Sequence, residues 1–302
     1  MTAPNEGGRA LAARLGPLGV WASQLQWQTA ALAQEAVARI AGLGYRAVWV
    51  GEATGKEAVA HASVLLGGGG DIVVATGIAS IAARDPMAMA NAARTLEDAY
   101  PGRFVLGLGV SHAFLNEQRD RPSERPYEQM AAYLDAMDEA PFVGPRVAAP
   151  PRVLAALGPR MLRLARDRAA GAHPYFVPVE HTSIARETLG TEPLLAPEQA
   201  VVLQDDPSIA RGLARRHMAT YLPLASYATN LRRLGWDDED LRDGGSDRLV
   251  DALVAWGDAG AIAARIREHR DRGADHVAVR VLTEDPARVP IPELEAIAAA
   301  AG

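Results

Sequence analysis

The chain has 302 residues, with 37 acidic and 31 basic side chains, a formal net charge of −6 and no cysteine. Disulfides, thiolate metal sites and a thiol nucleophile are therefore excluded. The acidic balance and the scattered arginines argue against nucleic acid as a partner, and no apolar run reaches the length of a membrane span. These features predict a soluble cytoplasmic protein with one domain over residues 1–302, in which residues 1–16 are flexible.

Short apolar runs alternate with helical patterns along the chain. Apolar runs that stop at glycine, proline or a polar residue are typical of buried parallel strands, whereas apolar residues three and four apart predict helices. Strands are predicted at 18–21, 45–50, 72–81, 104–110, 153–157, 172–177, 199–203 and 277–282. Helices are predicted at 29–43, 56–66, 86–96, 127–137, 161–168, 182–189, 261–272 and 291–301, and the stretch 207–256 is predicted to be almost entirely helical.

This alternation favours a single-domain α/β fold, a parallel (β/α)8 TIM barrel, over an open doubly wound sheet. The strand at 199–203 is needed to reach the eight strands of such a barrel, although it follows the two helix-breaking prolines Pro193 and Pro197. The helices of 207–256 exceed what one crossover needs. They are predicted to form an excursion between strands seven and eight, which is a lid, an oligomer contact or a peripheral bundle.

The fourth strand, in the stretch R-F-V-L-G-L-G-V-S-H at 103–112, delivers Ser111 and His112 to its carboxyl end. Barrel enzymes carry their chemistry at that end. Gly107 and Gly109 have no Cβ, so they either admit a flat ligand or a backbone, or relieve crowding inside the barrel. His112 is either a proton donor or acceptor, or a polar group at the mouth.

Other strand ends supply further candidates. There are no paired carboxylates on neighbouring loops, no histidine pair at metal spacing and no G-x-S-x-G elbow, so hydrolase and metal chemistry lose support. Gly158-Pro159-Arg160 is a helix start whose free backbone N–H groups attract anions, although a plain turn has the same pattern. The candidates at strand ends are Trp21, Ser23, Glu52, Ile78, Ser80, Ser111, His112, Gly158 to Arg160, His173, Tyr175, Glu198, Gln199 and Arg280, with Tyr221, Tyr227 and Asn230 as lining groups from the excursion.

Four stretches together resemble the bacterial-luciferase-like flavin and deazaflavin oxidoreductases, and most closely the F420-dependent branch. They are G-R-F-V-L-G-L-G-V-S-H at 102–112, A-T-G-I-A-S-I-A-A-R-D-P at 75–86, A-A-L-G-P-R-M at 155–161 and A-W-G-D at 255–258. The resemblance covers residues 18–282. It implies a (β/α)8 barrel, a homodimer, and a cofactor ring lying across the barrel mouth.

The resemblance also implies roles for single residues. Gly77 and Ile78 match a bulge with a non-prolyl cis peptide that supports the ring from behind. Ser111 and His112 match the position of ring-contacting and proton-transferring groups, and Gly158, Pro159 and Arg160 match the loop that holds the cofactor's phosphate. His173 lies where relatives contact the cofactor's tail, with a structural histidine beside Pro174 as the alternative.

One departure bears on the reaction. Sugar-phosphate dehydrogenases of this superfamily carry an Asp-His pair after strand two, whereas this chain has V-G-E-A at 50–53, with Glu52 in place of the aspartate and no histidine. Hydride transfer from reduced F420 to an activated C=C, C=N or carbonyl group of a small molecule is therefore favoured over alcohol oxidation, with His112 or Glu52 as the proton source. An FMN-dependent monooxygenase and a barrel that binds cofactor without turnover are the alternatives.

Overall fold

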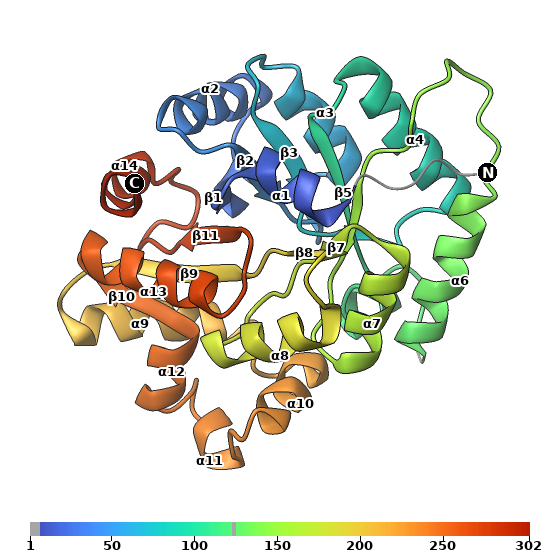
Figure 1. Ribbon diagram of the computed structural model, residues 1–302. Coiled ribbons are helices and arrows are strands. Elements are labelled where there is room, and N and C mark those ends of the chain that lie inside the picture. Colours follow the sequence, from blue (N-terminus) through green and yellow to red (C-terminus); the bar gives the residue numbers. More distant parts are fainter. Residues whose placement is uncertain (1–6, 123–124) are drawn as a thin grey trace.

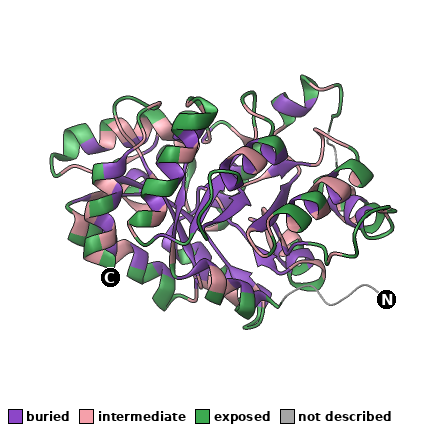
Figure 2. Cartoon of the chain, turned by 90° about the horizontal axis from the view of Figure 1, so that it is seen from above, coloured by how far each residue is buried: buried purple, intermediate pink, exposed green. Residues whose placement is uncertain are grey.

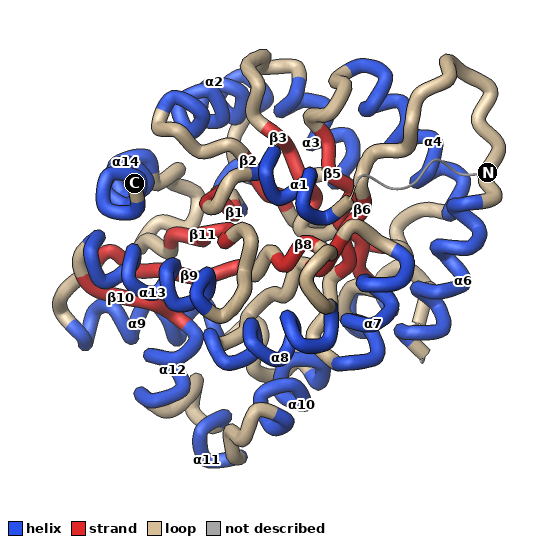
Figure 3. Tube along the Cα trace, in the orientation of Figure 1, coloured by secondary structure: helices blue, strands red, loops and turns tan. Residues whose placement is uncertain are grey.

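The computed structural model describes residues 7–122 and 125–302. Parallel strands curl into a central barrel, and helices surround it (Figure 1, Figure 3). The strands are β1 (Leu18–Trp21), β2 (Ala47–Val50), β3 (Val73–Thr76), β4 (Ala79–Ser80), β5 (Phe104–Gly109), β6 (Arg152–Leu154), β7 (Gly171–Ala172), β8 (Leu194–Leu195), β9 (Glu198–Leu203), β10 (Val254–Gly257) and β11 (Val277–Val281).

Most of the helices follow strands, as a barrel requires. Proline at the first helical position and an aspartate before it mark several starts: Asp85, ahead of Pro86, accepts a hydrogen bond from the N–H of Ala88 at 2.9 Å. The helices are α1 (Gly8–Leu15), α2 (Ala30–Gly42), α3 (Ala58–Leu66), α4 (Pro86–Ala99), α5 (Ala113–Glu117), α6 (Pro126–Asp138), α7 (Pro159–Arg168), α8 (Val179–Leu189), α9 (Pro207–Met218), α10 (Ala225–Arg233), α11 (Asp238–Leu241), α12 (Asp247–Leu253), α13 (Ala259–Asp271) and α14 (Ile291–Ala301), with a 3₁₀ turn at Ser23–Gln26.

The sheet runs in the order β10-β9-β11-β1-β2-β3-β5-β6-β7-β8, with β4 beside β5. Strands β8 and β9 occupy one strand position of the barrel, and only Ala196 and Pro197 separate them. Hydrogen bonds cross that interruption on both sides, because Glu198 N donates to Pro174 O at 2.9 Å and Ala278 N donates to Pro197 O at 2.9 Å. The barrel is thus closed, and the predicted TIM-barrel fold is confirmed.

Alternate residues of each strand pack on opposite faces of the sheet. Val48 packs with residues of the surrounding helices, whereas Ala47 and Trp49 belong to a second apolar cluster inside the barrel. Figure 2 shows this layering, with buried strands at the centre and helices exposed on their outer faces. Continuous apolar strands therefore result from burial on both faces.

The segment predicted to be flexible, residues 1–16, contains a helix, and its residues 1–6 lie outside the described residues. Residues 8–15 form α1, which places fully buried Leu11 and Leu15 in the inner cluster of the barrel. A Cβ on Gly8 would lie 2.2 Å from Leu194 N, so the helix start touches the backbone of β8. Helix α1 therefore lies across the amino-terminal end of the barrel (Figure 1).

The stretch predicted as helical over 207–256 ends in a strand instead. Helices α9 to α12 occupy most of it, but β10 pairs with β9 in parallel, from Val254 opposite Ala200 to Gly257 opposite Leu203. Strands β6 and β7 are shorter than predicted, so Leu157 and residues 173–177 lie in loops at the mouth. Among the described residues, no helix is long and apolar enough to cross a membrane.

Candidate functional site

A cluster of aromatic side chains lies at the carboxyl ends of the strands. Tyr175, after β7, has its ring centroid 5.5 Å from that of Trp21 on β1 and 5.1 Å from that of Tyr221. Tyr227, on α10, lies 5.6 Å from His112. We call the set Trp21, His112, Tyr175, Phe176, His217, Tyr221 and Tyr227 the mouth cluster. The excursion between β9 and β10 therefore contributes side chains to the mouth, as predicted for Tyr221 and Tyr227.

Two residues of the mouth adopt a backbone conformation that is rare for side chains other than glycine. Ser111 has a φ of 64° directly after β5, and Phe176 has a φ of 57° in the loop after β7. Such conformations cost about 1–3 kcal/mol each and concentrate at functional sites. They turn the chain sharply at the two places where predicted site residues leave the sheet.

The peptide bond between Gly77 and Ile78 is cis, which confirms the prediction, and it separates β3 from β4. Neighbouring groups leave room only for glycine here. A Cβ on Gly77 would lie 2.7 Å from Trp21 Nε1 and 3.2 Å from His173 Nε2. Across the sheet, Gly107 and Gly109 make room for this break, because their Cβ positions fall 1.8 Å from Thr76 O and 2.5 Å from Ile78 Cδ1. Gly107 and Gly109 thus admit the backbone and a side chain of the neighbouring segment around this break.

His173 is buried beneath this break. Its ring stacks on Trp49 at 4.3 Å, and its Nδ1 lies 2.6 Å from Ala196 O, so Nδ1 carries the proton. Burial lowers the pKa of His173 to about 4, and Nε2 is therefore an unprotonated acceptor. Neither His173 Nε2 nor Trp21 Nε1 has a hydrogen-bond partner among the described residues. An acceptor and a donor thus face the backbone of Gly77 with no protein partner.

His112 is half-buried at the start of α5. Its ring lies parallel to that of Phe114 at 6.1 Å, and burial lowers its pKa. A neutral imidazole is therefore the main form at neutral pH. Its place in the mouth cluster puts it within reach of a ligand at the carboxyl ends of the strands.

Glu52 is engaged in the protein's own structure. Its carboxylate accepts hydrogen bonds from Ser80 N at 2.7 Å and Ala58 N at 3.2 Å, and it forms an ion pair with Arg84. These contacts fix β4 and the start of α3. Because both oxygens are occupied, we give Glu52 no proton-transfer role.

The start of α7 is open to an anion. Gly158 precedes the helix without a side-chain cap, and Pro159 has no N–H, which leaves the N–H groups of Arg160 and Met161 free of intrahelical partners. The Arg160 guanidinium points elsewhere: it pairs with Glu128 at 2.9 Å and stacks over the Tyr127 ring at 4.3 Å.

Arg233 on α10 supplies the positive charge at this turn. A Cβ on Gly158 would lie 3.2 Å from Arg233 Nη1, which also donates to Asn230 Oδ1 at 3.2 Å. Sequence reasoning missed Arg233, because 75 positions separate it from Gly158 and only tertiary packing brings the two together. The three consecutive residues at the turn did predict the start of the helix.

A buried polar group lies on the β9–β11 side of the mouth. Glu198, on β9, accepts from Phe176 N at 3.3 Å, and burial raises its pKa to about 7 despite the neighbouring Arg280. Arg280, on β11, lies over the Trp21 ring at 4.7 Å and donates to the hydroxyls of Tyr175 and Tyr221. Both residues were strand-end candidates in the sequence.

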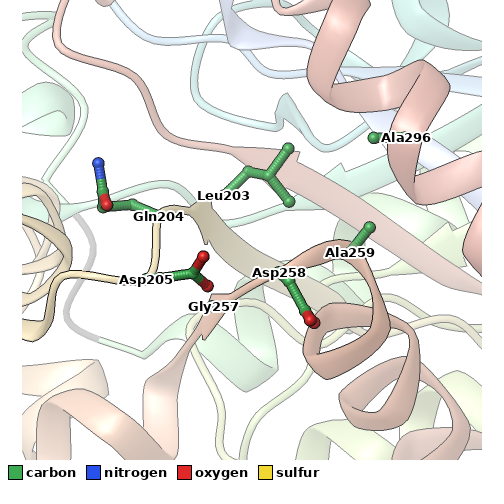
Figure 4. A pocket seen from close by; sticks show the side chains of 7 residues that line it. All are labelled: Leu203, Gln204, Asp205, Gly257, Asp258, Ala259 and Ala296. Carbon is green, nitrogen blue, oxygen red and sulfur yellow. The ribbon is translucent and has the colours of Figure 1, made fainter.

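A surface hollow of about 340 Å³ lies away from these groups. Its walls come from the ends of β9 and β10 and from α14 (Figure 4). The residues that line it are Leu203, Gln204, Asp205, Gly257, Asp258, Ala259 and Ala296. None of them is a predicted site residue. No cluster of metal-binding side chains occurs among the described residues.

Comparison with known proteins gives one family. The family described as luciferase-like monooxygenase matches residues 15–276. No curated protein matches the chain in sequence.

Solved structures share the fold at low sequence identity. An F420-dependent secondary alcohol dehydrogenase bound to an F420-acetone adduct has a TM-score of 0.74 and 15% identity, covering 95% of this chain and 99% of its own. The coenzyme F420-dependent tetrahydromethanopterin reductase from Methanopyrus kandleri has a TM-score of 0.75 and 15% identity, covering 93% and 97%. A type II Baeyer-Villiger monooxygenase component from Pseudomonas putida, in complex with FMN, has a TM-score of 0.67 and 14% identity, covering 90% and 93%.

Proposed function

Because the chain belongs to the luciferase-like monooxygenase family, we propose that it transfers a hydride between coenzyme F420 and a small organic substrate, in the direction of reducing an activated acceptor. The observation that carries this proposal is the uncapped start of α7 beside Arg233. Its free amides and Arg233 suit a phosphate group, which the N-terminus of a helix attracts. The resemblance of the fold to two F420-dependent enzymes supports this choice of cofactor.

The residues at the mouth fit such a cofactor. Gly158, Arg160 through its backbone N–H, and Arg233 would hold the phosphate; Pro159 sets the start of the helix. Gly77 and Ile78 would support the ring, with Ser111 beside it, and the unpartnered Trp21 Nε1 and His173 Nε2 face the same backbone. Reduced F420 supplies a hydride when it is bound.

The protein's own task is then to exclude water and to deliver a proton. The mouth cluster surrounds the site with apolar rings, in which electrostatic interactions are stronger than in water. His112 lies at its edge, and we assign it the transfer of a proton to the reduced product. Glu198 is a second titratable group of the mouth, with a pKa of about 7.

The experiment that tests the cofactor site is a titration of the purified protein with F420 and with FMN, followed by fluorescence. We expect tight binding of F420. Arg233→Met should weaken it by about tenfold or more, since it removes a charge-assisted contact to phosphate. Arg160→Met is the matched control, because that guanidinium contacts Glu128 and Tyr127, and its F420 affinity should stay within about threefold of the parent.

The opposite pattern, loss with Arg160→Met and none with Arg233→Met, would contradict the assignment of Arg233. Tight FMN binding without F420 binding would favour the alternative of an FMN-dependent monooxygenase, which the fold of the FMN-bound neighbour supports. Binding of F420 without any reducible acceptor would leave the alternative of a cofactor-binding barrel.

A further inference from the structure

Among the described residues, Arg280 has no carboxylate counter-ion within ion-pair distance. In the described part of the chain its guanidinium hydrogen-bonds only to two phenol hydroxyls, Tyr175 Oη and Tyr221 Oη, and forms no ion pair. Its Nε is buried and has no hydrogen-bond partner within residues 7–122 and 125–302. Many other arginines pair with carboxylates, as Arg152 does with Asp138 at 2.7 Å. A partly buried guanidinium in this state favours an anionic ligand.

Glu198 does not take the place of that counter-ion. It is buried and lies beside Arg280 in the barrel wall, where Glu198 is opposite Ala278 and Arg280 is opposite Ala200. Its Oε2 accepts from Phe176 N, and its Oε1 has no hydrogen-bond partner. A protonated carboxyl can donate a hydrogen bond to an anion, so Arg280 and Glu198 present donors from adjacent strands.

The surroundings of Arg280 are flat and apolar. Its guanidinium lies over the Trp21 ring at 4.7 Å, and Tyr175 and Tyr221 contact each other at 5.1 Å between ring centroids. Arg280 and both tyrosines remain partly exposed, so a ligand at the mouth can reach them. This combination matches an organic acid with a planar body.

We propose that Arg280, with Tyr175, Tyr221 and Glu198 beside it, binds the carboxylate of the substrate, which is a planar organic acid. The proposal rests on the proposed function, because this ligand is a substrate only if the mouth is a reductase site. The anion site at α7 is separate, since it lies at a helix start and uses Arg233.

The test is calorimetric titration of the cofactor-free protein with benzoate, with benzamide as its neutral counterpart and with inorganic phosphate. Benzoate should bind about tenfold or more tightly than benzamide, because only the carboxylate pairs with a guanidinium. Phosphate should bind at α7 and leave benzoate affinity unchanged. Equal affinities for benzoate and benzamide, or displacement of benzoate by phosphate, would overturn the proposal.

Variants separate the groups involved. Arg280→Met should abolish the preference for benzoate, and Tyr221→Phe should weaken benzoate by about threefold to tenfold. Tyr227→Phe is the matched control in the same cluster, because no hydrogen bond joins its hydroxyl to Arg280 in the described chain, and it should leave benzoate affinity unchanged. If Arg280→Met does not fold, the Tyr221→Phe and Tyr227→Phe pair decides, since equal effects of the two contradict the proposal.

The pH dependence is a further readout. Benzoate affinity should fall as pH rises through about 7, because ionised Glu198 repels the carboxylate, and Glu198→Gln should remove this fall. The neighbouring groups Tyr175, Tyr227 and His217 stay neutral as pH passes through 7, because burial raises the pKa of both tyrosines and lowers that of His217. A parent affinity independent of pH would count against the role of Glu198. If the parent protein binds F420 but not benzoate, this proposal fails and the proposed function stands. If it binds benzoate but not F420, the proposed function fails, and Arg280 is then a carboxylate-binding residue but its ligand is not a reductase substrate.

Discussion

His112 is the residue on which the proposed reaction depends most directly. If it supplies the proton, His112→Gln should keep F420 affinity within a few-fold and lower turnover of a reducible acceptor by about 10²–10⁴, the usual contribution of a positioned acid or base. Burial lowers the pKa of His112, so its protonated fraction grows only as pH falls below the ordinary pKa of a histidine. Parent turnover should accordingly rise toward acid pH.

Steady-state kinetics across pH, for the parent and His112→Gln, check this assignment. A structural histidine would instead give a variant with impaired F420 binding or stability and an unchanged pH profile per folded molecule. A variant with the parent's rate and profile would remove His112 from the chemistry.

Single residues also show which features of the site could not be predicted from the sequence. Gly158 to Arg160 were identified from their order in the chain, because the pattern of a helix start is local. The direction of the Arg160 side chain could not be predicted from the neighbouring residues in the sequence, because contacts with Glu128 and Tyr127 of α6 set it. The position of Glu52 after β2 was predicted correctly. Its hydrogen bond from Ser80 N and its ion pair with Arg84 were not predictable, because they form only when β4 packs near the end of β2.

At the scale of elements, periodicity located most strands and helices but missed α1, β10 and the break between β3 and β4. The residues before β10 read as an amphipathic helix, and no glycine or proline separates Leu253 of α12 from Val254 of β10. The apolar run is then shared by two elements, and only pairing with β9 decides where the strand begins. Likewise, the pattern over 72–81 is uniformly strand-like, whereas the chain breaks at Gly77 and Ile78.

Helix α1 gives a test at this scale. A methyl group on Gly8 would lie 2.2 Å from Leu194 N and 2.5 Å from Glu192 O, both backbone atoms that cannot move aside cheaply. Gly8→Ala should therefore lower the free energy of unfolding by about 1–3 kcal/mol, as overpacking does. Gly7→Ala is the matched control, since nothing lies within 4 Å of that Cβ position. Urea denaturation of both variants measures the difference, and equal stabilities would mean that α1 does not dock against β8.

Across the whole molecule, buried histidines link stability to pH. Burial lowers the pKa of His61, His173 and His276 to about 4 and that of His269 to about 3. These rings stay neutral in the folded protein, whereas in the unfolded chain they take up protons below the ordinary pKa of 6.5. Stability should therefore be fully present above about 6.5 and decline as pH falls toward 4, by up to about 1.4 kcal/mol per pH unit for each histidine.

Urea denaturation at pH 7.5 and at pH 5 measures this decline. His61 offers the cleanest variant, because neither of its ring nitrogens has a hydrogen-bond partner among the described residues. His61→Leu should retain more of its stability at pH 5 than the parent does, relative to pH 7.5. Equal slopes for the two proteins would show that His61 takes up its proton without unfolding.

The docking of α1 against β8 also sets an order of events during synthesis. Leu11 and Leu15 are synthesised before β8, at Leu194–Leu195, against which α1 docks. At 5–20 residues per second, the apolar face of α1 waits on the order of 10–40 s for its docking surface. During that interval the apolar residues Leu11 and Leu15 have no β8 backbone to dock against.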